Sequence, residues 1–128
     1  MDRACILVVE DNPDLRLMLH LLLETEGYEV VEAEDGLKAI EALAALQPDM
    51  IITDLVLPQL DGLSLIRTVR GCKQTSRLPI IAISAYGGDH LAKASANGAD
   101  ETVCKPMGVS HLLGVVARLL PHDTHTWH

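Results

Sequence analysis

Residues 50–54 read MIITD, a short apolar run that ends in an acid. A run of this kind predicts a strand buried on both faces of a parallel sheet. A second such run, CILVV at 5–9, ends in Glu10 and Asp11. Ligands of open α/β sheets bind outside the carboxyl ends of the strands. Asp54 therefore stands where a functional group is expected.

Elements of two kinds alternate along the whole chain. Three further strands and five helices are predicted, at 28–33, 79–83 and 101–104 for the strands and 13–26, 36–46, 63–70, 89–97 and 109–120 for the helices. Strands that alternate with helices predict an α/β fold with a parallel sheet, and right-handed crossovers place helices on both faces. No linker divides the pattern, so we expect one domain over residues 3–121 and a loose C-terminal tail over 122–128.

The composition favours a folded protein and disfavours several classes of partner. The 128 residues are 48% hydrophobic, contain no Phe and carry a formal net charge of −8. Nucleic-acid affinity comes largely from Lys and Arg, so direct nucleic-acid binding is not expected of this acidic chain. No apolar run approaches the ~20 residues that span a membrane, and no signal peptide is recognisable. Three scattered cysteines fit a reducing compartment, and we expect a cytoplasmic protein.

Polar side chains follow four of the five predicted strands. Glu10 and Asp11 follow the first strand, Asp54 the third, Ser84 the fourth and Lys105 the fifth. Each of them alone has an ordinary explanation as a solvated loop, a cap or a turn residue. If the strand ends are neighbours, three carboxylates, one hydroxyl and one ammonium share a single pocket, and this combination indicates a functional site.

The chemistry of that pocket suits phosphoryl transfer. Three carboxylates repel one another, and a hard cation such as Mg²⁺, which prefers oxygen ligands and often bridges carboxylates to phosphate, relieves the repulsion. Phosphoryl transfer needs positioning and charge neutralisation more than elaborate covalent machinery. Lys105 can neutralise one phosphoryl oxygen, and the Ser84 hydroxyl and nearby backbone N–H groups can bind others. The residues therefore predict a magnesium-assisted acceptor at Asp54.

The chain resembles the receiver (CheY-like) domains of two-component response regulators. The resemblance covers about residues 4–120 and rests on ILVVEDN at 6–12, DLVLPQLDG at 54–62, PIIAISAY at 79–86 and GADETVCKP at 98–106. It implies a flavodoxin-like doubly wound (βα)5 fold with a parallel five-stranded sheet in the order 2-1-3-4-5. It also implies a phosphorelay signalling domain rather than an enzyme, with weak self-catalysed phosphotransfer and autodephosphorylation.

The resemblance implies roles for the acidic residues. Asp54 is the implied phosphoacceptor and a magnesium ligand. Asp11 is the implied direct carboxylate ligand, and Glu10 acts on the metal through water. The backbone carbonyl of Val56 is the third implied protein ligand.

A second group of positions is implied to bind the phosphoryl group and to respond to it. Lys105 matches the phosphate-binding lysine, and its bond to Pro106 is often cis in relatives. Ser84 matches the switch hydroxyl, and Ala85 and Val56 lie at phosphoryl-binding positions. The implied phosphodonor is a histidine kinase or a histidine phosphotransfer protein. The implied domain is a monomer or a phosphorylation-dependent dimer, with a downstream effector that the sequence does not identify.

Several residues depart from the family pattern. Thr102 stands where relatives often carry an aromatic switch residue, and Met107 stands where Phe is common. Val56 and Tyr86 occupy positions that tune dephosphorylation, and both help an attacking water less than a small polar residue would. We therefore expect the signal to pass through residues 85–88 and Tyr86.

The output surface is expected to comprise the helix at 89–97, the strand at 101–104 and the helix at 109–120. Arg118 is the one charged residue between Gly108 and Leu120, so this last helix is expected to have an apolar outer face. Either an effector or the chain's own tail could cover it.

Two other functions fit the sequence less well than phosphoacceptance. A flavin- or nucleotide-binding domain would need a phosphate-cradling loop after the first strand, where this chain has Asp11, Asn12 and Pro13, and aromatic residues to stack on the ring. A phosphoaspartate hydrolase would need a DxDxT motif, which does not occur. The histidines at 122, 125 and 128 have metal-like spacing, but a loose tail explains them more simply.

Overall fold

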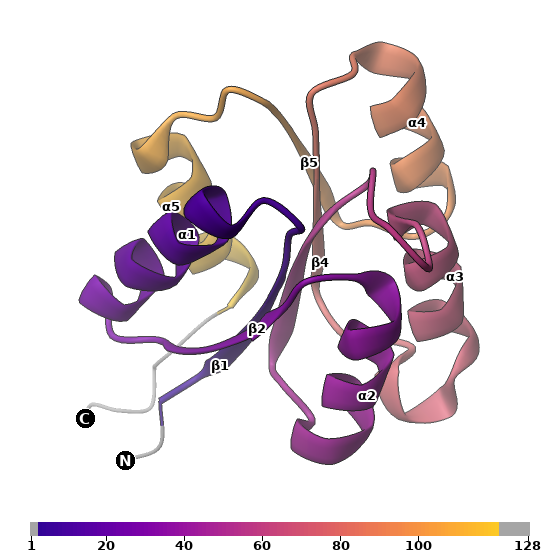
Figure 1. The fold of residues 1–128 in the computed structure, drawn as a ribbon, viewed down its shortest axis with the longest axis horizontal. Helices are drawn as coiled ribbons and strands as arrows, with labels where there is room; N and C mark the ends of the chain where they lie inside the picture. Colours follow the sequence, from indigo (N-terminus) through magenta and orange to yellow (C-terminus); the bar gives the residue numbers. More distant parts are fainter. Residues whose placement is uncertain (1–2, 121–128) are drawn as a thin grey trace.

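Within residues 3–120, which the computed structural model describes, five parallel strands form one sheet (Figure 1). They are β1 (Cys5–Val9), β2 (Glu29–Ala33), β3 (Met50–Asp54), β4 (Ile80–Ser84) and β5 (Glu101–Cys104). Their order, β2-β1-β3-β4-β5, confirms the flavodoxin-like topology predicted from the sequence. The predicted tail at 122–128 lies outside the described residues.

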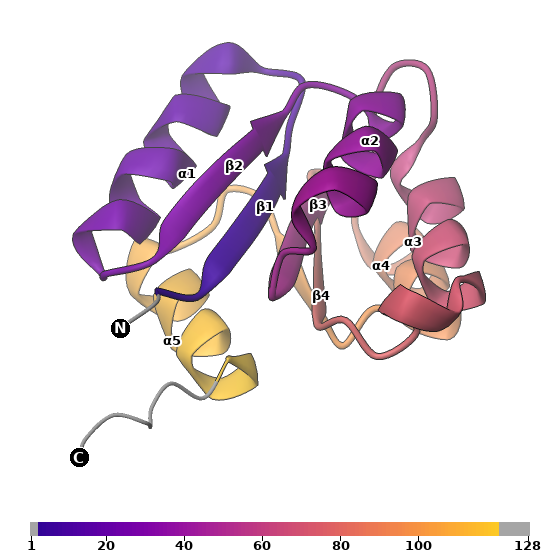
Figure 2. The same cartoon turned by 90° about the horizontal axis from the view of Figure 1, so that it is seen from below.

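Helices cover both faces of the sheet, as right-handed crossovers require. They are α1 (Pro13–Thr25), α2 (Gly36–Leu46), α3 (Gly62–Gly71), α4 (Gly88–Ala96) and α5 (Val109–Leu119), with a 3₁₀ turn, η1 (Lys73–Thr75), that the sequence did not suggest. Figures 1 and 2 show α1 and α5 on one face and α2, α3 and α4 on the other. No helix within residues 3–120 is long and apolar enough to cross a membrane.

Local signals explain where the first helix begins and ends. The side-chain oxygen of Asn12 accepts hydrogen bonds from the N–H groups of Asp14 and Leu15, at 2.9 and 3.1 Å. Pro13 follows at the first helical position, where a missing N–H costs nothing. Gly27, with φ +96°, ends the helix in a conformation that favours glycine. The chain is thus turned back within three residues of the end of β1.

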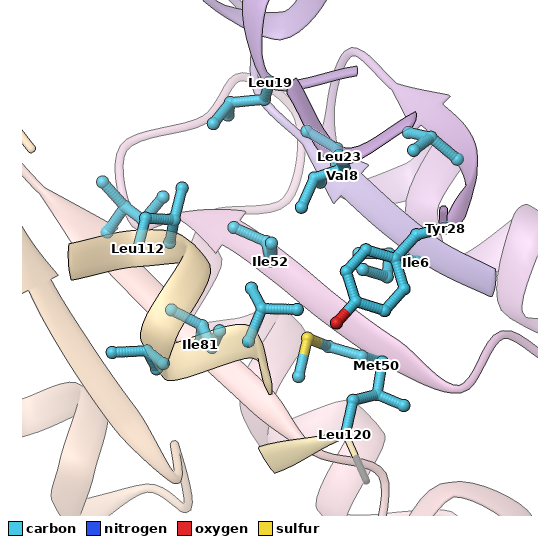
Figure 3. Packing of buried hydrophobic residues seen from close by; sticks show 14 of the residues in the cluster. Ile6, Val8, Leu19, Leu23, Tyr28, Met50, Ile52, Ile81, Leu112 and Leu120 are labelled. Carbon is cyan, nitrogen blue, oxygen red and sulfur yellow. The ribbon is translucent and has the colours of Figure 1, made fainter. Parts of the chain in front are cut away.

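The core consists of two apolar layers, one on each face of the sheet. In β1, Ile6 and Val8 belong to the layer under α1 and α5, whereas Leu7 and Val9 belong to the layer under α2, α3 and α4. Figure 3 shows the first layer, where side chains from α1 and α5 meet those of the central strands. All residues of β3 and β4 are buried, and both strands are apolar except at their carboxyl ends, where Thr53, Asp54 and Ser84 lie.

The exposed face of α5 differs from the expectation. The outer face of α5 is built of small and polar residues, because most of its leucines and valines turn toward the sheet: Ser110, His111, Gly114, Ala117 and Arg118. Larger exposed apolar side chains lie on α1 instead, where Leu17 and Leu21 are 52% and 53% exposed. The apolar outer face predicted for the last helix is therefore confined mainly to Val109 at its start.

An ion cluster ties α1 to the edge strand β2. The His20 ring lies between two carboxylates, with Nε2 3.2 Å from Glu24 Oε2 and Nδ1 hydrogen-bonded to Glu32. Arg16 Nε also donates to Glu32, at 2.8 Å. Burial lowers the pKa of His20, but the hydrogen bonds and charges of Glu32 and Glu24 outweigh burial and raise it above 6.5.

This raised pKa predicts a pH-dependent contribution to stability. Protonated His20 stabilises the fold fully below pH 6.5, and the contribution is lost as the pH rises through the higher folded-state pKa. We expect His20→Gln to lower the free energy of unfolding at about pH 6 by up to ~1 kcal/mol and to matter less at about pH 9. Urea unfolding at both pH values measures the difference. His111→Gln, on the exposed face of α5, is the control; equal losses at both pH values for His20→Gln would contradict the prediction.

Candidate functional site

The fold brings the predicted polar residues to one edge of the sheet. Glu10 and Asp11 directly follow β1, Asp54 is the last residue of β3, Ser84 is the last of β4, and Lys105 directly follows β5. Because β1, β3, β4 and β5 are parallel and adjacent, these strand ends are neighbours. Glu10, Asp11, Asp54 and Lys105 form one cluster there, whereas the hydroxyl of Ser84 bonds to Tyr86 and His90.

Three carboxylates form the centre of the site. Oxygens of Glu10, Asp11 and Asp54 lie within 4.8 Å of one another. Glu10 and Asp54 are 2% and 6% exposed, whereas Asp11 is exposed to solvent. This set of hard oxygen donors fits Mg²⁺, which takes one or two carboxylates and keeps several waters, and the exposed side at Asp11 leaves room for them.

Lys105 supplies the positive charge of the site. Its Nζ donates hydrogen bonds to Asp54 Oδ2 at 2.7 Å and to Glu10 Oε1 at 3.2 Å. Burial lowers the pKa of Lys105, but the hydrogen bonds and charges of these two carboxylates outweigh burial and raise it. The side chain is therefore held as an ammonium that joins the end of β5 to the ends of β1 and β3.

Glu10 is a buried carboxylate whose charge is only partly compensated. Burial and the nearby charge of Asp54 raise its pKa, while the Asn12 N–H, 3.1 Å from Oε2, and the Lys105 ammonium oppose the rise. The net direction is upward. One ammonium thus faces two buried acids and one exposed acid, and the site keeps an excess of negative charge that a cation can relieve.

Backbone and ammonium orient the Asp54 carboxylate from two sides. Oδ1 accepts the Val56 N–H at 3.1 Å, and Oδ2 accepts from Lys105. The Val56 side chain itself is 48% exposed at the rim of the site. A nucleophile needs this kind of fixed orientation to meet an incoming group in line.

The Ser84 hydroxyl is bound to its own loop and to α4. It is fully buried and accepts the Tyr86 N–H at 3.0 Å. Its other partners are the Tyr86 carbonyl at 3.1 Å and Nδ1 of His90 at 3.2 Å. The structure therefore places Ser84 beside the acidic site, with its hydrogen bonds directed to Tyr86 and His90.

His90 is a site residue that sequence reasoning missed. It lies in the first turn of α4, and its ring meets that of Tyr86 edge to face, with centroids 5.6 Å apart and an interplanar angle of 77°. Spacing could have indicated it, because α4 begins only four residues after β4 ends, and its first turn can therefore lie next to the last residue of the strand. A lone histidine in a predicted helix gave no reason to choose it.

The remaining predicted positions surround this centre. Ala85 and Tyr86 are exposed on the loop after β4, and Tyr86 is 62% exposed. Thr102 is partly buried in β5, where it pairs with Ala82 of β4. The Lys105–Pro106 peptide bond is cis.

Comparison with known proteins identifies the family. The family model described as the response regulator receiver domain matches residues 6–117. The chain therefore belongs to the response regulator receiver domains, the phosphorelay domains of two-component signalling. This membership decides between the functions weighed from the sequence, in favour of the receiver domain.

The relatives described next match this chain over about nine-tenths of its length. The chain is 34% identical over 116 residues to the DNA-binding dual master transcriptional regulator RpaA of Synechocystis, covering 90% of this chain and 48% of RpaA. It thus spans about half the length of that relative. The chemotaxis response regulator CheY4 of Vibrio cholerae has 29% identity and a TM-score of 0.87, covering 92% of this chain and 99% of its own.

A third relative holds a metal. The receiver domain of the sensor histidine kinase PA1611 from Pseudomonas aeruginosa PAO1 has 32% identity and a TM-score of 0.83, and the match covers 91% of this chain and 97% of that one. A magnesium ion is coordinated in the active site cleft of that structure.

The position of Asp54 depends on a close approach at Gly62, the first residue of α3. A Cβ atom at Gly62 would lie 2.4 Å from the Asp54 carbonyl oxygen and 2.5 Å from Leu55 Cα. We expect Gly62→Ala to lower the free energy of unfolding by about 1–3 kcal/mol, because backbone must shift to admit the methyl group.

Gly114→Ala in α5 is the matched control. Among residues 3–120, nothing beyond the adjacent residues and the helix's own backbone lies within 4 Å of a Cβ at Gly114, and alanine favours a helix interior by up to about 1 kcal/mol. Urea unfolding should therefore show opposite signs for the two Gly→Ala changes. A stabilised Gly62→Ala variant would show that the contact with the Asp54 backbone is not required.

Proposed function

We propose that this chain accepts a phosphoryl group on the Asp54 carboxylate in a Mg²⁺-dependent step and changes its surface in response. The observation that carries the proposal is the setting of Asp54. Its carboxylate is buried, fixed by the Val56 N–H and the Lys105 ammonium, and lies within 4.8 Å of two further carboxylates. Such a setting favours a nucleophile aimed at an anionic group that arrives with a cation.

Some of the acids would bind the metal directly and one would bind it through water. Asp11 and Asp54 supply direct carboxylate ligands, the Val56 carbonyl supplies a third, and Glu10 acts through water. Bound magnesium supplies charge neutralisation between these carboxylates and the phosphoryl oxygens. The exposure of Asp11 supports its role as a direct ligand, since an exposed carboxylate can turn to meet an ion.

The transfer itself is a displacement at phosphorus. An Asp54 oxygen attacks the phosphorus of a phosphohistidine on a histidine kinase or histidine phosphotransfer protein. A P–O bond forms, the P–N bond breaks, and the imidazole leaves with the electron pair and takes up a proton. Lys105 can pass from Asp54 Oδ2 to a phosphoryl oxygen, and the backbone N–H groups of Val56 and Ala85 can bind others.

Water attack on the acyl phosphate would end the signal slowly. The exposed side chain of Val56 offers no hydrogen bond to orient a water, and the exposed Tyr86 can obstruct its approach. Self-catalysed phosphotransfer and hydrolysis of this kind make a signalling domain with weak catalytic activity rather than a dedicated enzyme.

The response would leave through α4, β5 and α5. Ser84 moves to bind a phosphoryl oxygen, and the loop at 85–88 and α4 follow. Thr102 is too small to act as an aromatic switch, so Tyr86 is the aromatic residue placed to report the change. An ion pair between Arg118 of α5 and Glu101 of β5, at 2.7 Å, links two parts of this surface.

Phosphorylation with a small donor tests the acceptor. With Mg²⁺ and acetyl phosphate, the wild-type protein should gain one phosphoryl group per chain, and Asp54→Asn should gain none, because an amide is a poor nucleophile. Intact-protein mass spectrometry measures the gain. Asp61→Asn, at the N-cap of α3, is a matched control that should still be labelled. Equal labelling of Asp54→Asn and wild type would refute the assignment.

Magnesium titration tests the ligands. Asp11→Ala should weaken Mg²⁺ binding by more than about tenfold, and Glu10→Ala by less, because a direct ligand contributes more than one that acts through water. Asp14→Ala, an exposed acid in the first turn of α1, is the control for general loss of negative charge. Calorimetry on the four proteins gives the affinities, and an unchanged affinity in Asp11→Ala would exclude it as a ligand.

A further inference from the structure

The Ser84 hydroxyl contacts one side chain, that of His90, which has no role in the proposed function. Two of the hydroxyl's partners, the Tyr86 N–H and carbonyl, belong to the same loop. The third, Nδ1 of His90 at 3.2 Å, comes from the first turn of α4. A fully buried hydroxyl with this many partners is held in one rotamer, because turning away would leave buried polar atoms unpaired.

We propose that His90 is a positioning residue that holds the Ser84 hydroxyl in its resting orientation and thereby restrains phosphorylation of Asp54. The inference rests on the proposed function, in which Ser84 turns to bind a phosphoryl oxygen. Rotation about χ1 of Ser84 moves Oγ away from Nδ1, so the contact with His90 must break before the hydroxyl can serve the phosphoryl group.

Proton counting shows that the contact forms with either neutral histidine tautomer. When Nδ1 is unprotonated, it accepts the hydroxyl proton of Ser84. When Nδ1 carries the proton, it donates to Oγ, and the hydroxyl proton goes to the Tyr86 carbonyl. A hydroxyl has one proton, so it cannot keep the bond to an acceptor in its own loop and also donate to a phosphoryl oxygen.

The same contact connects the hydroxyl to the output helix. His90 is part of α4, and its ring packs edge to face on Tyr86, which is the exposed aromatic residue of the loop. α4 begins at Gly88 without a side-chain cap, and the N–H groups of His90 and Leu91 bond to the Gly87 carbonyl at 3.1 and 3.3 Å. Release of His90 therefore frees the first turn of α4 and the Tyr86 ring together.

Three variants at His90 separate the hydrogen bond from the ring packing. His90→Phe keeps a ring against Tyr86 but lacks Nδ1, and His90→Ala lacks both. His90→Asn puts a polar atom near the place of Nδ1, and it should restore the restraint. Losing one hydrogen bond should raise the initial rate of Asp54 labelling by acetyl phosphate about two- to tenfold in His90→Phe and His90→Ala. His90→Asn should stay near the wild-type rate.

The fourth variant tests whether the effect passes through the hydroxyl. In a Ser84→Ala background, His90→Phe should cause no further change in rate. Equal acceleration by His90→Phe in the presence and absence of the hydroxyl would overturn the proposal.

A second measurement needs no phosphorylation. Three-bond NMR couplings should show one χ1 rotamer of Ser84 in the resting wild type and a mixture in His90→Phe. An unchanged rotamer distribution would overturn the role of His90, even in a protein that is labelled normally. Failure of the wild type to be labelled at all would instead refute the proposed function, so the two failures are distinguishable.

Discussion

The ion pair between Lys105 and Asp54 is the interaction on which the site depends. A buried carboxylate is costly unless it is paired and hydrogen-bonded, and Asp54 has a second acid, Glu10, beside it. The 2.7 Å hydrogen bond from Lys105 to Asp54 offsets part of the repulsion between the two carboxylates in the resting protein. It does not remove the excess negative charge. The resting site is therefore stable and still suited to a cation and a mobile anionic group.

The sheet supplies the geometry that this pair needs. Asp54 ends a strand in the middle of the sheet, and Lys105 follows an edge strand two positions away in the strand order. The lysine crosses the end of β4 to reach the acids, and its backbone N–H donates to the Ser84 carbonyl at 2.8 Å. The same short segment thus fixes the ammonium and the strand that carries Ser84. Packing of Gly62 against the Asp54 backbone fixes the position of the acceptor strand end.

In the proposed function, Asp54 and Ser84 would have different parts in the response to phosphorylation. Asp54 is held by contacts that an incoming phosphoryl group can take over directly, because Lys105 and the Val56 N–H are donors that suit any anion. Ser84 is held by Tyr86 and His90, which a phosphoryl group does not replace. In the proposed function, the cost of phosphorylation would therefore be concentrated at the Ser84 contacts, next to α4. Phosphorylation of Asp54 could then reach the surface at α4, because Ser84 would either keep its bonds to Tyr86 and His90 or exchange them for a bond to the phosphoryl group.

The sequence alone determined the fold class, the strand order through its resemblance, and the residues at the strand ends. Apolar runs such as 50–53 and caps such as Asn12 act locally, and local signals survive in a linear chain. Acids after β1 and β3 and the lysine after β5 could be grouped because parallel strands place equivalent ends together. Glu10, Asp11, Asp54 and Lys105 are accordingly found where they were predicted.

Only the tertiary structure decided which contacts these residues make. Lys105 pairs with Asp54, 51 residues away in the sequence, and with Glu10, 95 residues away, and no local pattern encodes contacts over such separations. The exposed face of α5 proved small and polar because packing against the sheet, and not composition, selects which leucines turn inward. His90 gained its place beside Ser84 from the exact point at which α4 begins. A shift of one residue in a helix turns a side chain by about 100°, so such a contact requires the folded backbone.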